Sequence, residues 1–260
     1  MIYNNLMLIL QNIRVMKKIL IMLGASMLLL ACHKEINYEL PEGMVEIPDA
    51  VDLGLSVNWA SFNLGSVQEG DYGYYYAWGD TRRQSVVLWK NYRYSNSDGT
   101  KFKKYCLASQ ASWWEGEGAP DGFSSLRSED DIVIKRLGGR WRLPTKEEVE
   151  ELMDTQYHPE KFTWTMNAVA VNNEGKEIKG VRITRNSTGN SIFIPYSGRL
   201  NGDGFEFTGA RAYLWTSTLS EGATGGPDGA YNLGLDKSEG GGVWSNSRCY
   251  GFAVRPVQIK

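Results

Sequence analysis

The chain has 260 residues and a formal net charge of −2, with 28 Lys and Arg against 30 Asp and Glu. Removing residues 1–31, which we predict to be an export signal, takes away three basic residues and no acid, leaving a formal charge of −5. A mildly acidic chain lacks the electrostatic footprint of a nucleic-acid-binding protein. Glycine and aromatic residues are abundant and long helical periodicities are scarce, which favours short strands joined by glycine turns.

The first 32 residues carry the pattern of a bacterial lipoprotein signal. Met16-Lys17-Lys18 forms a short basic region, and residues 19–31 form an uncharged apolar run. That run is shorter than the roughly 20 residues that span a bilayer. It ends in Leu29-Leu30-Ala31-Cys32, which resembles the lipobox cut by lipoprotein signal peptidase. We predict a start at Met16, with an extended basic region over residues 1–15 as the alternative, and a mature chain that begins at Cys32.

Lipidation of Cys32 would fix the location of the protein. The resemblance implies a diacylglycerol on the thiol and a third acyl chain in amide linkage. Each CH₂ group buried in the bilayer contributes about 0.8 kcal/mol of binding free energy, so chains of this length anchor the protein irreversibly. The charged residues 33–35 weakly resemble the surface-export signal of Bacteroidota lipoproteins. We therefore expect an outer-membrane lipoprotein at the cell surface, with the periplasmic face as the alternative. Residues 32–48 are the predicted tether, and residues 49–260 a single domain, since about 210 residues suffice for one core.

The predicted domain opens with strands. Apolar residues occupy alternate positions from Val51 to Trp59, the period of a half-buried strand. The aromatic residues from Tyr72 to Trp78 repeat this alternation and are predicted to lie in the core. Glycine and proline mark loops at residues 96–99 and 115–122.

Two helices follow close together. We predict that Ser128 caps the first, with apolar Ile134 and Leu137 on one face and Gly138-Gly139 at its end. Thr145 to Glu148 forms a capping box that starts the second. Its acidic first turn suits the helix dipole, so we assign those glutamates no catalytic role.

Strands return after the helices. A hairpin pattern surrounds Ser187 to Asn190, and further strands are predicted in residues 212–218, 231–235 and 252–254, between glycine-rich segments. Two short helices among many short, mostly antiparallel strands and glycine-rich loops indicate an α+β domain.

Six sequence blocks stand out along the predicted domain. They are Val51-Asp52-Leu53-Gly54-Leu55-Ser56-Val57-Asn58-Trp59-Ala60, Tyr76-Ala77-Trp78-Gly79-Asp80-Thr81, Trp141-Arg142-Leu143-Pro144-Thr145-Lys146-Glu147-Glu148, Gly189-Asn190-Ser191-Ile192-Phe193-Ile194-Pro195, Leu214-Trp215-Thr216-Ser217-Thr218 and Tyr250-Gly251-Phe252-Ala253-Val254-Arg255-Pro256-Val257. In this order they resemble the Fibrobacter succinogenes major paralogous domain, a family common in Bacteroidota lipoproteins and some fimbrial components. The Arg-Leu-Pro-Thr block and the Gly-Phe-x-Val-Arg end are also similar to the wider C-type-lectin-like group, which includes formylglycine-generating enzymes. The resemblance implies a C-type-lectin-like fold.

The enzymes of that group need residues that this chain supplies poorly. The resemblance implies, for activity, either two cysteines close in sequence that bind copper or three histidines on one iron. Cys106 and Cys249 are far apart, and the two histidines are His33, in the tether, and His158. We therefore expect a non-catalytic domain without a resident cofactor, and keep an enzyme as the disfavoured alternative.

Three further sites are candidates. Asp228 and Asn246 keep the order of the calcium-dependent lectin ligands but supply too few oxygens for calcium, so we expect no metal site there. Trp113 and Trp114, beside an acidic glycine-rich loop, offer flat faces for a sugar, with burial of the loop as the alternative. Cys106 and Cys249 form either a disulfide or two buried free thiols.

These observations favour a surface lipoprotein that binds an extracellular glycan or protein. The alternative is a component of a fimbrial or envelope assembly. Assembly needs an apolar patch or an open edge strand, whereas sugar binding needs exposed aromatic and polar side chains together.

Overall fold

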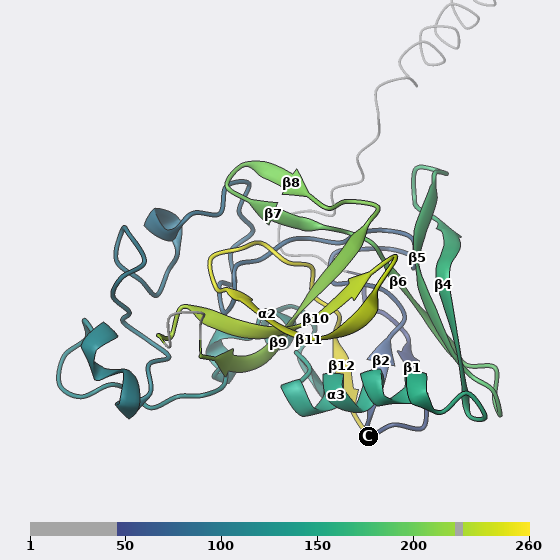
Figure 1. Cartoon of the computed structure of the whole chain (residues 1–260), viewed down its shortest axis with the longest axis horizontal. Coiled ribbons are helices and arrows are strands. Elements are labelled where there is room, and N and C mark those ends of the chain that lie inside the picture. Colours follow the sequence, from purple (N-terminus) through teal and green to yellow (C-terminus); the bar gives the residue numbers. More distant parts are fainter. Residues whose placement is uncertain (1–45, 222–225) are drawn as a thin grey trace, which may run out of the picture. The chain divides into compact units, whose positions relative to one another are not determined.

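Short antiparallel strands make up most of the regular structure in the computed structural model, which describes residues 46–221 and 226–260 (Figure 1). Cys32 and residues 1–31 lie outside the described residues, as does most of the predicted tether. Few, short helices accompany several small sheets, so the domain is α+β. In the described part of the chain, no helix has the length and apolarity needed to cross a membrane.

The first sheet joins the two ends of the domain. Its order is β1-β2-β12-β3, formed by Ala50–Val51, Val57–Ala60, Val257–Ile259 and Trp141–Arg142. The predicted strand over residues 51–59 is therefore two strands. Gly54, with φ +75°, lies in the connection, where a left-handed conformation is easy only for glycine.

Two further sheets contain most of the strand residues. One has the order β11-β10-β9, with strands Gly240–Ser247, Gly229–Asp236 and Arg211–Ser220. The other has the order β4-β5-β6, with strands Phe162–Val171, Glu177–Arg185 and Ser191–Pro195. A small hairpin pairs β7 (Arg199–Asn201) with β8 (Gly204–Glu206).

Strand β9 separates two apolar clusters, because successive side chains of a strand point to opposite faces. Trp215 belongs to a cluster of mostly aromatic residues that includes Trp78 and Phe252. Its neighbour Leu214 belongs to a second, mainly aliphatic cluster with Trp59. Most of β9 is buried, as a strand with core on both faces requires.

The two predicted helices are present, and the start of the first is corrected. Ser128 begins a 3₁₀ turn, η3 (Ser128–Asp130), and α2 (Ile132–Leu137) is capped by Asp131, whose Oδ1 accepts from the backbone N–H of Val133 at 2.8 Å. The other oxygen of Asp131 accepts from Leu143 N–H at 2.9 Å, which ties the cap to the segment after β3.

The second helix, α3 (Lys146–Asp154), is confirmed with its capping box between Thr145 and Glu148. Its acids have structural partners: Glu148 pairs with Arg142, and Glu151 accepts hydrogen bonds from Ser56. Three other 3₁₀ turns lie in loops or after α3: η1 (Trp89–Asn91), η2 (Ala108–Trp113) and η4 (Thr155–Tyr157).

The predicted alternation from Tyr72 to Trp78 does not form a strand. Gly73 has φ +78°, and the segment makes one isolated bridge, Tyr76 to Phe252. Tyr76 and Trp78 are buried as predicted, whereas Tyr72 is half-buried. Residues 61–131 run as loops, 3₁₀ turns and isolated bridges, held by backbone and side-chain hydrogen bonds.

Candidate functional site

Trp113 and Trp114 are largely used for packing. Trp113 ends η2, is half-buried, and packs against the aromatic cluster. Its indole lies so close to Gly226 that a Cβ on that glycine would stand 2.7 Å from the ring. The indole of Trp114 folds over Gly116 in the same way, and its N–H is buried without a partner among the described residues. The pair therefore matches loop burial better than an open sugar platform.

The side chain of Asn246 is hydrogen-bonded to neighbouring residues of the protein. Its Nδ2 donates to Oδ1 of buried Asn232 at 2.9 Å, and Nη1 of Arg199 lies 3.5 Å from Asn246 Oδ1. The backbone carbonyl of Asp228 accepts from Arg248 N–H at 2.8 Å. A guanidinium on the amide oxygen that calcium would need opposes a cation at this place. In residues 46–221 and 226–260, no three His, Cys, Asp or Glu gather as a set of metal ligands.

Cys106 and Cys249 are both buried free thiols, which is the second of the two alternatives the sequence left open. Cys106 Sγ donates to the carbonyl of Gln110 at 3.2 Å, and Cys249 Sγ lies 3.4 Å from Ser247 Oγ. Burial raises the pKa of both thiols, which keeps them protonated and weakly nucleophilic.

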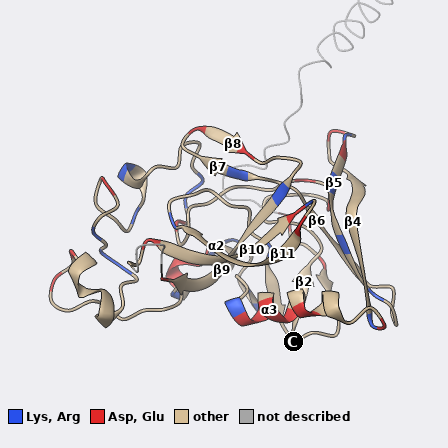
Figure 2. Ribbon diagram, viewed as in Figure 1, with Lys and Arg blue, Asp and Glu red and all other residues tan. Residues whose placement is uncertain are grey.

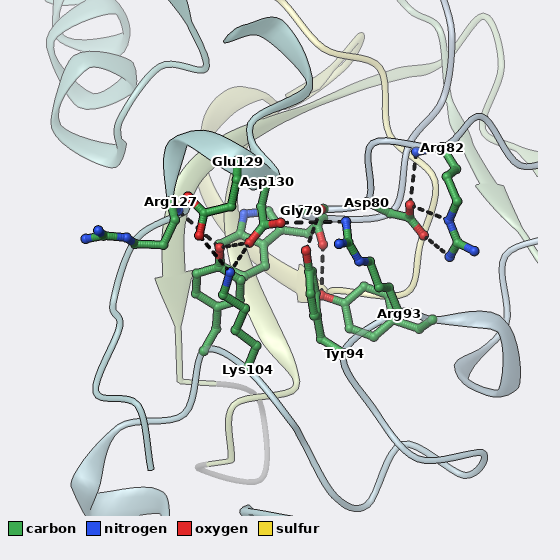
Figure 3. Close-up of polar contacts among 12 residues, drawn as sticks. Gly79, Asp80, Arg82, Arg93, Tyr94, Lys104, Arg127, Glu129 and Asp130 are labelled. Atoms are coloured by element: carbon green, nitrogen blue, oxygen red, sulfur yellow. Dashed lines mark hydrogen bonds and ion pairs between the residues drawn. The ribbon is translucent and has the colours of Figure 1, made fainter. Parts of the chain in front are cut away.

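A buried carboxylate, Asp130, organises the long loop region (Figure 3). The side chain is 1% exposed, and its Oδ2 accepts from Lys104 Nζ and from Tyr105 Oη, both at 2.5 Å. Arg93 Nη1 lies 3.6 Å from Oδ1. Burial disfavours the charged form, but hydrogen bonds from Lys104, Tyr105 and Tyr94 outweigh it and lower the pKa of Asp130. This cluster fixes the loops and presents its cations outward.

An exposed aromatic patch forms where the β7–β8 hairpin meets β9 and β11. We define the Arg199 patch as Arg199, Glu206, Phe207, Trp244 and Tyr250. Phe207 is 42% exposed. Phe205 is 61% exposed and is paired with Leu200, so it lies on the other face of the hairpin from Arg199 and Glu206, where its ring meets Tyr75 edge-on at 5.0 Å. Exposed aromatic side chains grouped in this way mark a contact surface.

The guanidinium of Arg199 lies among the rings of this patch. Its Cζ is 4.3 Å from the ring centroid of Tyr250 and 5.2 Å from that of Phe207. Nε donates to Glu206 Oε2 at 2.8 Å, and the other oxygen of Glu206 accepts from Asn201 Nδ2 at 3.0 Å. These hydrogen bonds, from Asn201 first and then from Arg199, lower the pKa of Glu206. Planar polar groups are thus held beside exposed rings.

Backbone geometry fixes Phe207 in this position. Its φ is +61°, a left-handed conformation that costs a bulky residue about 1–3 kcal/mol. The backbone N–H groups of Ala210 and Arg211 donate to its carbonyl at 3.0 and 2.9 Å and hold the turn. The guanidinium of Arg211 lies 4.7 Å from the ring. Strain of this kind is kept where a side chain has to be held in one direction.

Sequence reasoning did not single out Arg199, Phe205 or Phe207. The available signal was local: Phe205 and Phe207 stand two residues apart in a segment with Gly202, Gly204 and Gly209, where two exposed aromatic residues are unexpected. Tyr250, whose ring packs on Arg199, is more than 40 residues away from both phenylalanines in the sequence, so no local pattern joins it to them.

Comparisons of this chain with protein-family models, with curated proteins and with solved structures give no match.

Proposed function

We propose that this chain is an outer-membrane lipoprotein, anchored through Cys32, whose domain over residues 49–260 is a non-catalytic, C-type-lectin-like binding domain for an extracellular glycan. The observation that carries the proposal is the Arg199 patch, where exposed Phe207 lies beside a fixed network of guanidinium, carboxylate and amide groups, with exposed Phe205 on the other face of the same hairpin.

The chemistry of the patch suits a sugar. A pyranose has an apolar C–H face that can cover an aromatic ring, and the area removed from water stabilises the contact. Its hydroxyls donate and accept, which matches Glu206 as acceptor and Arg199 and Asn201 as donors. The polar groups are already oriented by one another, so binding costs little side-chain entropy.

A glycan array tests the proposal. We use the chain from residue 32 with Cys32→Ala, which removes the lipid, and measure the affinity for any glycan that it retains. Replacing Phe205 and Phe207 together with Ala should weaken binding about tenfold or more, because buried aromatic contacts dominate such interfaces. The matched control is Tyr157→Ala, which removes a ring that is 73% exposed on η4. Equal affinity of both variants, with unchanged melting temperatures, would remove the patch as the site, and an array without a retained glycan would overturn the function.

Assembly with other subunits is the second candidate function, and β4 favours it. This strand is the edge of its sheet, has no charged residue in ten, and exposes Val169 and Val171 at 48% and 52%. Open apolar edges pair with other chains. The Val171 end of this edge is covered, because Gln68 Nε2 donates to the Val171 carbonyl at 3.0 Å. The pairing of β4 with β5 also shifts in register between Thr165 and Ala168.

The assembly candidate predicts concentration-dependent association. Sedimentation velocity of the wild-type chain should then show oligomers, and Val169→Lys should abolish them, because a charge on an edge strand blocks pairing. Ser109→Lys, at an exposed position on η2 and outside β4, is the control for added charge alone. A monomer at all concentrations contradicts assembly through β4.

A further inference from the structure

Basic residues concentrate in one segment of an otherwise acidic chain. Residues 82–104 hold seven Lys or Arg and one acid, a formal charge of +6, whereas the whole chain has −2. Figure 2 shows these basic positions along the loops that precede α2, away from the acids of α3. The basic segment consists of loops and the short turn η1, and most of its charged side chains are exposed.

Buried carboxylates hold the inner side of this segment, and the cations form its outer side. Asp80 and Asp130 are each 1% exposed. Arg82 donates from Nε and Nη2 to Asp80 at 3.0 and 2.8 Å, yet its side chain is 62% exposed. Arg93, beside Asp130, is 43% exposed. Figure 3 shows both arginines with their carboxylates. Each guanidinium keeps further N–H donors free of these carboxylates, because it has five in all.

Pairing between the two ends of the segment brings more cations together. Ser95 bridges Phe102, and Lys103 N–H donates to the carbonyl of Tyr94 at 2.9 Å. Two cations lie over the Tyr94 ring: Arg93 Cζ is 5.2 Å and Lys104 Nζ is 5.8 Å from its centroid. Three exposed acids lie on or beside this surface: Glu129, which is paired with Lys104, Asp98 within the segment, and Glu115, whose backbone N–H donates to the Phe102 carbonyl at 2.9 Å. The seven cations of the segment outnumber these three acids.

The basic segment continues into the Arg199 patch. Val87 pairs with Gly202 in the β7–β8 turn, through hydrogen bonds of 2.8 and 3.2 Å. Arg83 Cζ lies 4.1 Å from the ring centroid of Tyr74, and the next residue, Tyr75, meets Phe205 on the other face of the β7–β8 hairpin from Arg199. An extended polymer that crosses the hairpin can therefore contact the exposed Phe205 and Phe207 rings and the cations of the segment at once.

We infer that the glycan is an acidic polysaccharide, whose sugar rings contact the Arg199 patch while its carboxylate or sulfate groups bind the basic segment, residues 82–104. This inference rests on the proposed glycan-binding function. Charge on a polymer chain provides many weak, screened contacts, so affinity should fall steeply with salt. A neutral glycan would use the patch alone and show little salt dependence.

Matched polymer pairs test the inference. We measure binding of the Cys32→Ala chain to polygalacturonate and to its methyl-esterified form, and to dextran sulfate and dextran. The charged member of at least one pair should bind about tenfold or more tightly at about 0.05 M salt, and the preference should vanish near 0.5 M. Replacing Lys90, Lys101 and Lys103, which are exposed and do not pair with a buried carboxylate, together with Gln should remove the preference, while melting temperature stays unchanged.

The control variant removes the same amount of charge elsewhere. It replaces with Gln three exposed lysines on or near the β4–β5 hairpin, Lys161, Lys176 and Lys179, and it should keep the preference for the charged polymer. Binding that depends on Phe205 and Phe207 without any preference for charge would overturn the acidic ligand and keep the glycan function. Absence of binding to every polymer and to the array would overturn both. Binding to phosphatidylglycerol vesicles that is equally tight and is lost in the Lys90, Lys101 and Lys103 variant would assign the basic segment to a membrane surface and overturn the inference.

Discussion

Replacing Arg255 with Met should lower the free energy of unfolding by about 3–5 kcal/mol, because three buried acceptors lose their donor. Arg255 is fully buried, and its Nε, Nη1 and Nη2 donate to Asn63 Oδ1, the Ala60 carbonyl and the Phe193 carbonyl at 2.8, 2.8 and 2.7 Å. These contacts join β2, the following loop and β6. Burial lowers the pKa of Arg255, but a guanidinium starts so high that it stays charged at neutral pH. Urea unfolding of both proteins gives the difference.

A second buried arginine is the matched control. Arg248 is also 0% exposed, but in the described structure its Nε and Nη2 have no partner, and Nη1 donates to the Tyr105 carbonyl at 3.2 Å. Its guanidinium packs on aromatic rings, with Phe102 at 4.3 Å. Replacing Arg248 with Met fills similar volume and removes two unpaired donors, so stability should change by no more than about 1 kcal/mol. Equal losses in the two variants would show that hydrogen bonding does not distinguish them.

The parts of the fold that sequence predicted are those fixed by contacts within a few residues. The Thr145–Glu148 capping box needs four consecutive residues, and α3 begins where it predicts. The start of α2 was wrong because Ser128 and Asp131 are both good caps, and the choice depends on Leu143 N–H, twelve residues away from Asp131. The alternation from Tyr72 to Trp78 was misleading, because Gly73 interrupts the extended backbone and no neighbouring strand pairs along it.

The candidate site was missed for a related reason. Trp113 and Trp114 were candidates for sugar binding because they are adjacent aromatic residues in a loop. In the structure, Gly226 and Gly116 allow both indole rings to pack closely against the chain. The Arg199 patch depends instead on contacts between β7, the β8 end and Tyr250, which no sequence window contains. The basic segment is visible in the sequence, but the net charge of the whole chain averages it away. Local charge is the better indicator of an ionic surface.

Asp130→Asn should lower the free energy of unfolding by about 3 kcal/mol at neutral pH, because Lys104 and Arg93 lose the buried charge that they share. The effect should depend on pH. The folded-state pKa of Asp130 is lowered, chiefly by the hydrogen bonds from Lys104, Tyr105 and Tyr94, which overcome burial. When the pKa of a carboxyl group is lower in the folded than in the unfolded protein, its ionised form stabilises the folded state. This contribution is complete above the pKa of the unfolded state, about 3.9, and is lost as the pH falls through the pKa of the folded state.

The difference in unfolding free energy between wild type and Asp130→Asn should therefore be constant near neutral pH and shrink below about pH 4. Glu129→Gln is the control, since it removes an acid that pairs with the same Lys104 at 3.1 Å but is 59% exposed, and it should cost less than about 1 kcal/mol. A difference that stays the same at low pH would mean that the shape of Asp130, rather than its charge, holds the loops. The buried charge of Asp130 would then not be what fixes Lys104 and Arg93, and the Tyr94 and Tyr105 rings would have the larger part in ordering these two cations.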